Sequence, residues 1–573
     1  MINTIKTILK KEKIDFFLLP NNDEFFSEYL PKDQKKIELI SGFTGSNATI
    51  IITNNKSYFF TDGRYILQAK QQLDNSEFVI LDLNKISVLE WLKINVKAKS
   101  LAIDPKLTSI KFVLECQKFV KNIVFISEEI NNLLYQKPNK KSAIFYCNQK
   151  QNTSSNIKRE QISKNLEVDA LFITKPENLC WLVNIRSCDI EYTPIFLAYA
   201  ILHKNNKITI FADKKRFKDC EIENFEIIPF EKMQDYLKNF FSNTPTIQID
   251  DRTTNYWLYK ILQNTKTKII FKNCPIELAK SIKNPFEIKS AYQAHEIDGL
   301  AVTKFLYWLK NSYNNSKQID EISAQEKLFQ LRKQSPKFIS NSFATISAYA
   351  ENSAIIHYNS SKQTNKKIVG NSLYLIDSGG QYFGSDMMAT TDVTRTLAIG
   401  SPTLEMIENY TRVLKGHIAI ARLKFPRNIC GANIDSIARF HLWNDGKDYA
   451  HGTGHGVGSF LSVHEGPCAI SKRSYQQLLP NMILSNEPGF YKDQEYGIRL
   501  ENLVVIKEYN DDFLNFETLT LVPFEPELID YKMLTYPEKK WLKEYHQGIY
   551  LKLKDKLLES ERKWLNNICQ RFF

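Results

Sequence analysis

The sequence predicts a mixed α/β (α+β) fold that is divided among several domains. At 573 residues the chain is longer than one hydrophobic core usually organises, so we expect three or four domains. Over the first half, short β-rich runs separated by polar turns alternate with helical patterns, and in the second half longer helical patterns precede apolar, strand-like runs. The length and this mixture of periodicities together favour a multidomain α/β protein.

Residues 1–140 are expected to form the first domain. The N-terminal segment has the pattern of a short basic amphipathic helix that leads into a strand. A β-hairpin is predicted where two β-rich runs, Ala48–Ile52 and Ser57–Phe60, flank an Asn-Asn pair, because these residues favour tight turns between strands. A helix-like segment, Tyr65–Leu73, follows the hairpin.

Residues 141–280 are expected to form a second domain that repeats the first. The polar segment Gln136–Ser155 is the predicted boundary between them. A second hairpin pattern, at 196–211, aligns with the first so that the turn and a closing Asp are in register. We predict two copies of one domain that arose by duplication, and a pair of unrelated hairpins is the alternative.

Residues 281–510 are expected to form a third domain, and residues 511–573 a small helical extension. In the extension, Thr535 and Glu538 have the spacing of a capping box that opens an aromatic-rich helix. The helices expected in the third domain are Glu287–Lys310, Glu321–Gln334, Thr403–Leu423 and Ile434–Trp443, and the strands are Leu373–Ile376, Thr394–Ile399, Met482–Ser485 and Gly497–Ile506.

Composition and charge exclude several kinds of partner. With 76 basic and 64 acidic residues spread along the chain and no dense Lys/Arg block, we expect no nucleic-acid partner. The longest apolar run, 194–202, is far shorter than the ~20 residues that span a bilayer, and the N-terminus lacks the pattern of a signal peptide, so we expect no membrane partner. The nine cysteines show no C-x-x-C spacing, which favours reduced thiols and a cytoplasmic location.

Histidine is concentrated in one glycine-rich stretch, Tyr449–Pro467. It contains His451, His455 and His464, three of the nine histidines, and its alternate glycines allow the backbone to bend and to approach other segments closely. A functional site is the prediction, and a glycine loop with satisfied histidines is the alternative. Neither H-E-x-x-H nor G-x-G-x-x-G fits this stretch, so any metal partners of His455 must come from elsewhere in the chain.

Carboxylates at apolar strands of the third domain supply such partners. Buried carboxylates need compensation, and a salt bridge between Arg499 and Glu501 on one strand face would explain only one of them. Four acids with a neutral His455 carry four negative charges, which two divalent cations would neutralise while leaving room for a bridging hydroxide. Oxygen ligands favour a hard ion such as Mn²⁺ or Mg²⁺, and the one imidazole shifts the choice to Mn²⁺, Co²⁺ or Zn²⁺. The acids are Asp377, Asp392, Glu487 and Glu501.

The motifs around these residues resemble those of the pita-bread metallopeptidases, and most of all the long, three-domain cytosolic Xaa-Pro aminopeptidases. The likeness also extends through segments of the first two domains and the C-terminal region, so it covers nearly the whole chain. The motifs are LIDSG at 375, TTDVTRT at 390, HGTGHGVGSFLSVHEGP at 451, NEPGFY at 486 and GIRLEN at 497.

The resemblance implies a fold and a set of site residues. The fold is two creatinase-like N-terminal α/β domains before a pita-bread catalytic domain, typically in a homodimer. Glu487 would also accept the proton of the bridging water, His464 would contact the scissile carbonyl or the proline, His451 would bind substrate or shuttle protons, and His357 would help close the pocket. The implied ligands of a dinuclear, usually manganese, centre are Asp377, Asp392, His455, Glu487 and Glu501.

The function implied is hydrolysis of the bond between an N-terminal residue and a following proline. A prolidase and a methionine aminopeptidase share these ligands, but the three-domain layout argues against the first and the two extra N-terminal domains against the second. A creatinase-type enzyme lacks this ligand set. A catalytically inactive peptide-binding module would have lost ligands, and none is lost here.

One departure from the family pattern lies between Asp377 and Asp392, where this chain is a few residues longer than usual. We expect the extra residues to bulge outward from the segment that joins the two ligands. Asp386 lies within them and lacks the TDVTRT context of Asp392, so it is not predicted as a ligand.

Overall fold

The computed structural model describes residues 1–96, 99–138, 141–147, 149, 151–217, 224–241 and 246–572. The chain divides into two compact units. We call them the N-terminal unit, which comprises Met1–Asn148 and Thr153–Ile276, and the catalytic unit, which comprises Gln149–Asn152 and Glu277–Phe573.

The first half of the N-terminal unit is a six-stranded mixed sheet in the order β4-β3-β2-β1-β5-β6. The predicted hairpin is present as the antiparallel pair β2–β3, with Asn54 and Asn55 in the turn. The strands are β1 (Phe16–Pro20), β2 (Thr49–Thr53), β3 (Ser57–Thr61), β4 (Phe78–Asp82), β5 (Ser100–Ile103) and β6 (Asn122–Phe125). The helices are α1 (Ile2–Lys11), α2 (Lys36–Ser41), α3 (Ile66–Gln72), α4 (Val88–Asn95), α5 (Ile110–Cys116) and α6 (Glu128–Leu134).

The second half of this unit repeats the same topology, in the order β12-β11-β10-β8-β13-β14. In the first sheet, β1 pairs antiparallel with β2 and parallel with β5, and in the second sheet β8 pairs in the same way with β10 and β13. The outermost strand at each edge of both sheets is parallel to its neighbour. This match supports duplication over two unrelated hairpins. The strands are β7 (Phe145–Tyr146), β8 (Ala170–Ile173), β9 (Ile185–Arg186), β10 (Tyr199–His203), β11 (Ile208–Phe211), β12 (Phe225–Ile228), β13 (Thr246–Ile249) and β14 (Lys268–Phe271). The helices are α7 (Ser155–Lys164), α8 (Pro176–Val183), α9 (Met233–Phe241) and α10 (Tyr256–Gln263), and α11 (Pro275–Ser281) begins at the end of this unit and continues into the catalytic unit.

The catalytic unit combines several small sheets with long helices. Its sheets run β15-β18-β19, β16-β17-β20 and β21-β28-β27-β24, with the pairs β22-β23 and β25-β26. The strands are β15 (Phe338–Asn341), β16 (Ile346–Tyr349), β17 (Ser372–Ser378), β18 (Gly380–Gly384), β19 (Met387–Thr390), β20 (Val393–Ile399), β21 (Lys424–Pro426), β22 (Gly454–His455), β23 (Ala469–Ile470), β24 (Ile483–Asn486), β25 (Gly489–Lys492), β26 (Tyr496–Arg499), β27 (Asn502–Glu508) and β28 (Phe513–Thr518). The helices are α12 (Pro285–Asn314), α13 (Glu321–Arg332), α14 (Leu404–Ala421), α15 (Gly431–Trp443), α16 (Tyr536–Leu553) and α17 (Glu559–Gln570), with the 3₁₀ turn η4 (Ala350–Ala354).

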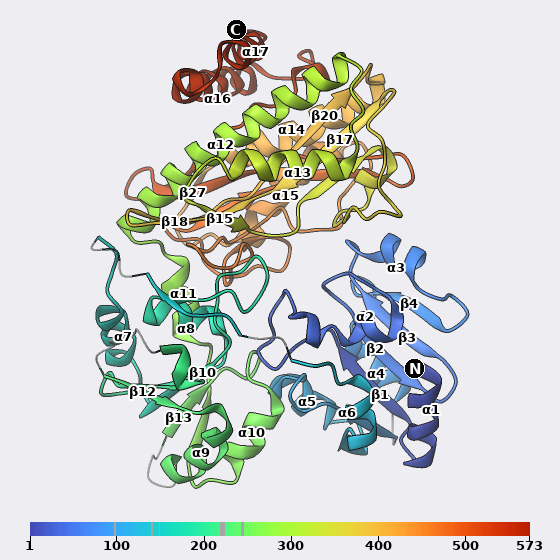
Figure 1. The fold of residues 1–573 in the computed structure, drawn as a ribbon, viewed down its shortest axis with the longest axis vertical. Helices are drawn as coiled ribbons and strands as arrows, with labels where there is room; N and C mark the ends of the chain where they lie inside the picture. The colour runs from blue at the N-terminus through green and yellow to red at the C-terminus, as the bar shows by residue number, and fades with distance from the viewer. Residues whose placement is uncertain are drawn as a thin grey trace. The chain divides into compact units, whose positions relative to one another are not determined.

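The longest helix, α12, is packed against the strands that carry the acidic motifs (Figure 1). It presents Val302, Phe305 and Leu309, spaced as one helical face, to a core that includes Ile376 of β17 and Leu397 of β20. The C-terminal helices α16 and α17 pack on one another and on α12. As predicted, Thr535 and Glu538 form the capping box of α16.

The structure corrects one predicted strand. The segment Gly497–Ile506 is expected as a single strand, but it is divided into β26 and β27, with Leu500 and Glu501 between them. The reason is that β26 pairs with β25, whereas β27 pairs with β24 and β28, so the chain changes sheets at this point. The Glu501 amide instead donates to the Thr394 carbonyl, 3.1 Å away.

The mixed α/β architecture is as predicted. Within the part of the chain that the structure describes, no helix combines the length and apolar character needed to cross a bilayer.

Candidate metal centre

The five predicted ligands all lie at strand ends in the catalytic unit. Asp377 is the penultimate residue of β17, and Asp392 immediately precedes β20, the antiparallel neighbour of β17. His455 ends the short strand β22, Glu487 follows β24 directly, and Glu501 occupies the break between β26 and β27. Strand ends from separate sheets therefore bring together residues that are up to 124 positions apart in the sequence.

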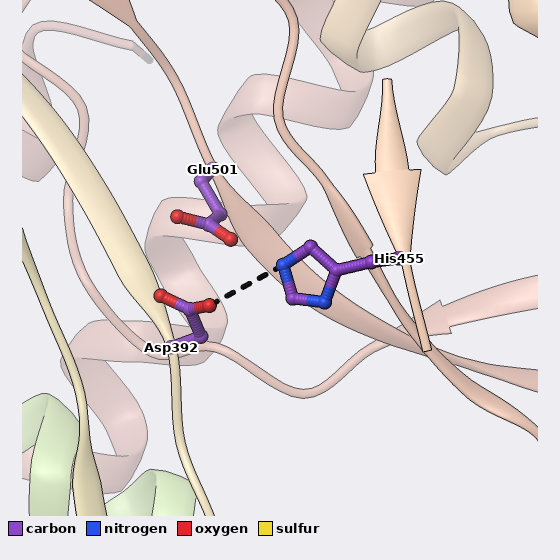
Figure 2. A group of neighbouring side chains, drawn as sticks. All are labelled: Asp392, His455 and Glu501. Carbon is purple, nitrogen blue, oxygen red and sulfur yellow. Dashed lines mark ion pairs between the residues drawn. The ribbon is translucent and has the colours of Figure 1, made fainter. Parts of the chain in front are cut away.

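Three of these side chains converge most closely. Asp392, His455 and Glu501 each offer a ligand atom within 4.8 Å of the other two (Figure 2). The Nε2 atom of His455 lies 3.5 Å from Oδ2 of Asp392 and 3.3 Å from Oε1 of Glu487. The imidazole thus faces two carboxylates, with the third nearby.

Asp377 is held by an arginine. Its Oδ2 accepts a hydrogen bond of 2.6 Å from Nη2 of Arg499, and Nη1 of the same guanidinium donates to the Tyr491 hydroxyl at 2.7 Å. Arg499 therefore pairs with Asp377 and not with Glu501, the partner considered from the sequence. Its charge compensates one of the four acids.

Hydroxyl groups orient two of the other carboxylates. Thr394 Oγ1 donates to Oε2 of Glu501 at 2.7 Å, and Ser485 Oγ donates to Oε1 of Glu487 at 3.0 Å. The same Ser485 oxygen accepts the backbone N–H of His455 at 2.9 Å, so one serine fixes two neighbouring candidate ligands. These hydrogen bonds restrict the rotamers of groups that must hold a common geometry.

A close backbone contact explains a glycine of the motif. A Cβ atom on Gly454 would lie 1.9 Å from the Ser485 carbonyl oxygen, so only glycine lets β22 approach β24 this closely. The approach brings His455 beside Glu487.

The crowded acids perturb one another. Burial, together with the charges of Asp377 and Glu487, raises the pKa of Asp392 to about 6, although His455 opposes the shift. Burial and the same kind of repulsion raise the pKa of Glu501 well above its ordinary value. For His455, burial lowers the pKa, but the Asp392 hydrogen bond and the charge of Glu487 outweigh it and raise the pKa to about 9. The site therefore favours added positive charge.

The donor set fits divalent cations. Oδ1 of Asp377 and Oδ1 of Asp392 are buried and accept no hydrogen bond from the residues that the structure describes. The His455 Nδ1 lies 3.0 Å from the Gly456 carbonyl oxygen, to which it can only donate, so that Nε2 is the nitrogen left to bind a metal. Carboxylate oxygens with one imidazole nitrogen suit Mn²⁺, Co²⁺ or Zn²⁺.

Two of the remaining predicted residues line the same centre. The ring of His464 lies against that of His455, with centroids 4.3 Å apart and an interplanar angle of 85°. His451 Nε2 is 2.9 Å from the Tyr491 hydroxyl, and its Nδ1 is 4.0 Å from Oε2 of Glu487. His357, which precedes the other site residues in the sequence, is half-buried in the turn after η4.

The segment before His357 is nevertheless tied to the centre. Ser353 Oγ accepts the backbone N–H of Gly497 at 2.7 Å, which attaches η4 to β26 two residues before Arg499. Asp386 is separate from the candidate ligands, because it forms an ion pair of 2.8 Å with Lys337 and its side chain is 53% exposed.

The sequence interpretation missed the group that links Asp377 to His451. Arg499 and Tyr491 connect them in a continuous hydrogen-bonded chain through the tyrosine hydroxyl. Tyr491 lies in the motif NEPGFY and Arg499 in GIRLEN, so their place in these motifs could have indicated that they belong to the site.

Comparison with known proteins places this geometry in a family. The model of metallopeptidase family M24 matches residues 289–508, and a model of the C-terminal region of this family matches residues 512–572. Two models of the creatinase/prolidase N-terminal domain match residues 1–133 and 136–287.

Curated relatives match nearly the full chain. An Xaa-Pro aminopeptidase 1 from Dictyostelium discoideum is 35% identical over 99% of this chain and 95% of its own length. A probable Xaa-Pro aminopeptidase P from Coprinopsis cinerea is also 35% identical, over 98% of this chain and 96% of its own length.

Solved structures agree with these matches. An X-prolyl aminopeptidase from Caenorhabditis elegans, described as a cytosolic enzyme with a di-nuclear active site, is 31% identical with a TM-score of 0.90 and covers 97% of this chain and 95% of its own. A prolidase from Pyrococcus furiosus is 25% identical with a TM-score of 0.50 and covers 63% of this chain and 98% of its own. Because the full-length relatives and the family models agree, the chain belongs to metallopeptidase family M24, as an enzyme of the Xaa-Pro aminopeptidase type with creatinase/prolidase N-terminal domains.

Proposed function

We propose that this chain removes the N-terminal residue of peptides whose second residue is proline, with a centre of two divalent cations. The observation that carries the proposal is the convergence of buried carboxylates and His455 in a chain that matches Xaa-Pro aminopeptidases over nearly its full length. The two-ion centre of the nematode relative supports the same number of ions here.

The ions would be held by the five side chains at the strand ends, with Mn²⁺ as the preferred metal. When the ions are bound, the chemistry that they supply is polarisation of the scissile carbonyl and a bridging hydroxide as the nucleophile. The ligands proposed are Asp377, Asp392, His455, Glu487 and Glu501.

Glu487 is the proposed proton acceptor. Its Oε1 is occupied by the Ser485 hydroxyl, while Oε2 points toward His451, 4.0 Å from Nδ1. A carboxylate between a fixed donor and an imidazole can take a proton from the attacking water and keep it near the leaving nitrogen. His451, whose Nε2 lies 2.9 Å from the Tyr491 hydroxyl, is proposed to bind substrate or to shuttle protons.

The proline nitrogen makes this leaving group difficult, because it belongs to a tertiary amide and must be protonated to depart. His464, beside His455 at the centre, is proposed to contact the scissile carbonyl or the proline. His357, in the turn after η4, is proposed to help close the pocket around the proline ring.

Prolidase activity is the second candidate, because prolidases share the catalytic fold. The comparison with the Pyrococcus enzyme argues against it: almost all of that enzyme aligns, yet it covers only 63% of this chain. The nematode aminopeptidase, in contrast, covers 97% of this chain. A catalytically inactive peptide-binding module is disfavoured because all five ligand positions are present.

We also propose the domain boundaries 1–140, 141–280, 281–510 and 511–573, a cytoplasmic location and a homodimer. The family-model matches lie close to these boundaries, and the nematode relative is described as cytosolic. The homodimer is proposed because the chain resembles the long, three-domain Xaa-Pro aminopeptidases. Sedimentation at several protein concentrations tests the oligomeric state.

The experiment that tests the function is a peptide panel on protein with defined metal content. Arg-Pro-Pro should release Arg, an N-acetylated version should resist, and Ala in place of the second-position Pro should lower kcat/KM at least ~10-fold, about 1.4 kcal/mol of transition-state binding. Equal rates on both peptides would reject the Xaa-Pro assignment. Cleavage of Xaa-Pro dipeptides alone would identify a prolidase, and no cleavage with both metals bound would favour the binding module.

A further inference from the structure

His464 is carried by a closed loop, residues 456–465, that we call the histidine loop. Its base is closed by a hydrogen bond of 2.7 Å from the Glu465 N–H to the Gly456 carbonyl, and its middle by one of 3.0 Å from Gly458 to Ser462. The loop begins next to His455, so any shift of its base moves His464 relative to the candidate metal ligands.

The tip of the histidine loop is in a costly conformation. Phe460 is fully buried and has a φ of 53°, in the left-handed region that bulky side chains rarely adopt. Such a residue persists only where its surroundings hold it, at a cost of roughly 1–3 kcal/mol.

The surroundings that hold it come from the hairpin β18–β19. Phe383 at the outer end of β18 stacks on Phe460, with ring centroids 4.9 Å apart and an interplanar angle of 20°. Ser459 Oγ donates to the Met388 carbonyl at 2.8 Å, and Gln381 Nε2 donates to the Leu461 carbonyl at 2.8 Å. Three consecutive tip residues are therefore each fixed by this hairpin.

This hairpin lies in the segment between Asp377 and Asp392, which is a few residues longer than the family pattern. Strand pairing continues past Phe383, opposite Met388, to Gly384, opposite Met387, before the chain turns at Ser385 and Asp386. The segment expected as an outward bulge is thus an ordered, lengthened hairpin, and its outer residues Phe383 and Met388 contact the histidine loop.

The base of the histidine loop is fixed separately. Glu465, 4% exposed, forms ion pairs with Lys280 and Lys283, of which the Lys280 pair measures 2.6 Å. A buried carboxylate paired with two lysines resists displacement, because separating the charges leaves them uncompensated in the interior. The tip is therefore the part of the loop that depends on the hairpin.

We propose that the lengthened β18–β19 hairpin is a positioning element for His464, and that Phe383 acts through Phe460 to hold the histidine loop ready for the proline-containing substrate. The inference rests on the proposed function, because it assigns His464 a role in the peptidase reaction. It makes Phe383 a positioning residue, which contacts neither substrate nor metal.

The test is a double-mutant cycle on the full-length, metal-loaded enzyme. Phe383→Ala should lower kcat for Arg-Pro-Pro roughly 10-fold with little change in KM, because a misplaced catalytic group costs rate more than affinity. In a His464→Ala background the same substitution should cost less than ~2-fold, since residues that act through one another are not additive. Phe383→Tyr, which keeps the stacked ring, should restore most of the rate.

Two outcomes would overturn the proposal. One is an equal loss from Phe383→Ala with and without His464, and the other is failure of Phe383→Tyr to recover activity while the metal content is normal. Asp386→Asn is the matched control, because it removes only the exposed ion pair to Lys337 at the hairpin tip and should leave kcat unchanged.

A measurement that needs no activity separates this proposal from the proposed function. Hydrogen exchange of residues 458–464 should be faster in Phe383→Ala and unchanged in Asp386→Asn. If Phe383→Ala does not fold, Phe383→Leu takes its place, with a smaller increase expected. If the enzyme cleaves no peptide, the proposed function is refuted. In that case the exchange measurement alone tests the positioning role, and unchanged exchange in the Phe383 variants refutes it.

Discussion

Glu487 and His464 both lie next to His455, and substitutions should separate their roles. Glu487→Gln should lower both metal content and kcat, because it removes a ligand charge 3.3 Å from the imidazole and the proposed proton acceptor. His464→Ala should lower kcat by roughly 10² while both ions stay bound, as expected of a positioned polar catalyst. Elemental analysis beside steady-state kinetics checks both.

The control for this pair is Asp386→Asn, an acid that lies between the ligand motifs in sequence but pairs with Lys337 at the surface. It should retain both ions and full kcat. Loss of metal from the His464 variant would show that this residue is itself a ligand.

How far single residues could be predicted depends on whether their partners are local. Motif residues were recognisable from sequence, and the structure places His455 between Asp392 and Glu487. The partner of Arg499 was not predictable, because the local i, i+2 neighbour Glu501 competes with Asp377, which is 122 residues away and reached only through the fold. Sequence spacing carries no information on that choice.

At the scale of elements, the close approach of β22 to β24 can be tested with two glycines. Gly454→Ala should destabilise the protein by roughly 2 kcal/mol or more, because its Cβ would meet the Ser485 carbonyl oxygen, a backbone atom that cannot rotate away. It should also weaken metal binding by moving His455. Chemical denaturation and metal titration measure the two effects.

Gly548 is the matched glycine for this comparison. It lies inside α16, and a Cβ there would meet no described atom within 4 Å. Gly548→Ala should raise stability by about 0.5–1 kcal/mol, since alanine loses less conformational entropy in a helix. If Gly454→Ala were equally harmless, the close approach would not be the reason for glycine in the motif.

The docking of the C-terminal extension should depend on pH through His546. This side chain is fully buried in α16, stacked on Phe572, and its Nε2 accepts the backbone N–H of Phe524 at 3.1 Å. Burial lowers its pKa from 6.5 to about 3, and the charge of Arg395 adds to the shift. The unfolded chain therefore takes up the proton first, so the stabilisation is complete above pH 6.5 and is lost as pH falls toward 3.

The expected loss from this residue is about 2 kcal/mol between pH 7.5 and pH 5. His546→Gln keeps an uncharged side chain with an acceptor, so its free energy of unfolding should fall less steeply over the same range. Denaturation at several pH values compares the two slopes, and parallel slopes would mean that His546 does not titrate on unfolding.

Elements whose signals are local agree well with prediction, whereas those set by tertiary pairing do not. The hairpin β2–β3 and the capping box of α16 follow from turn and cap residues that are neighbours in sequence. The break at Leu500 and Glu501 depends on a change of sheet partner, and the paired β18 and β19 contact the histidine loop, which is distant in the sequence. The periodicity of apolar residues along the sequence predicts neither feature.

At the scale of the molecule, the division into two units places all the candidate chemistry in one of them. The cluster of Asp392, His455 and Glu501, the group that could hold a metal ion among the described residues, belongs to the catalytic unit. The two sheets in the N-terminal unit repeat one topology, which agrees with the duplication that the aligned hairpins indicated. The N-terminal unit has its own hydrophobic core, and none of the predicted metal ligands lies among its described residues.

This division predicts how metal affects thermal unfolding. A ligand that binds only the folded catalytic unit stabilises it by RT ln(1 + [L]/Kd), about 2.7 kcal/mol at a free metal concentration of 100 Kd. Calorimetry of the full chain should show two transitions, of which Mn²⁺ raises one and leaves the other in place. Removing the metal with a chelator should reverse the shift, and Glu501→Gln should abolish it without moving the second transition. A shift of both transitions by Mn²⁺ would show that the two units unfold together, and a shift that persists in Glu501→Gln would place the metal at other side chains.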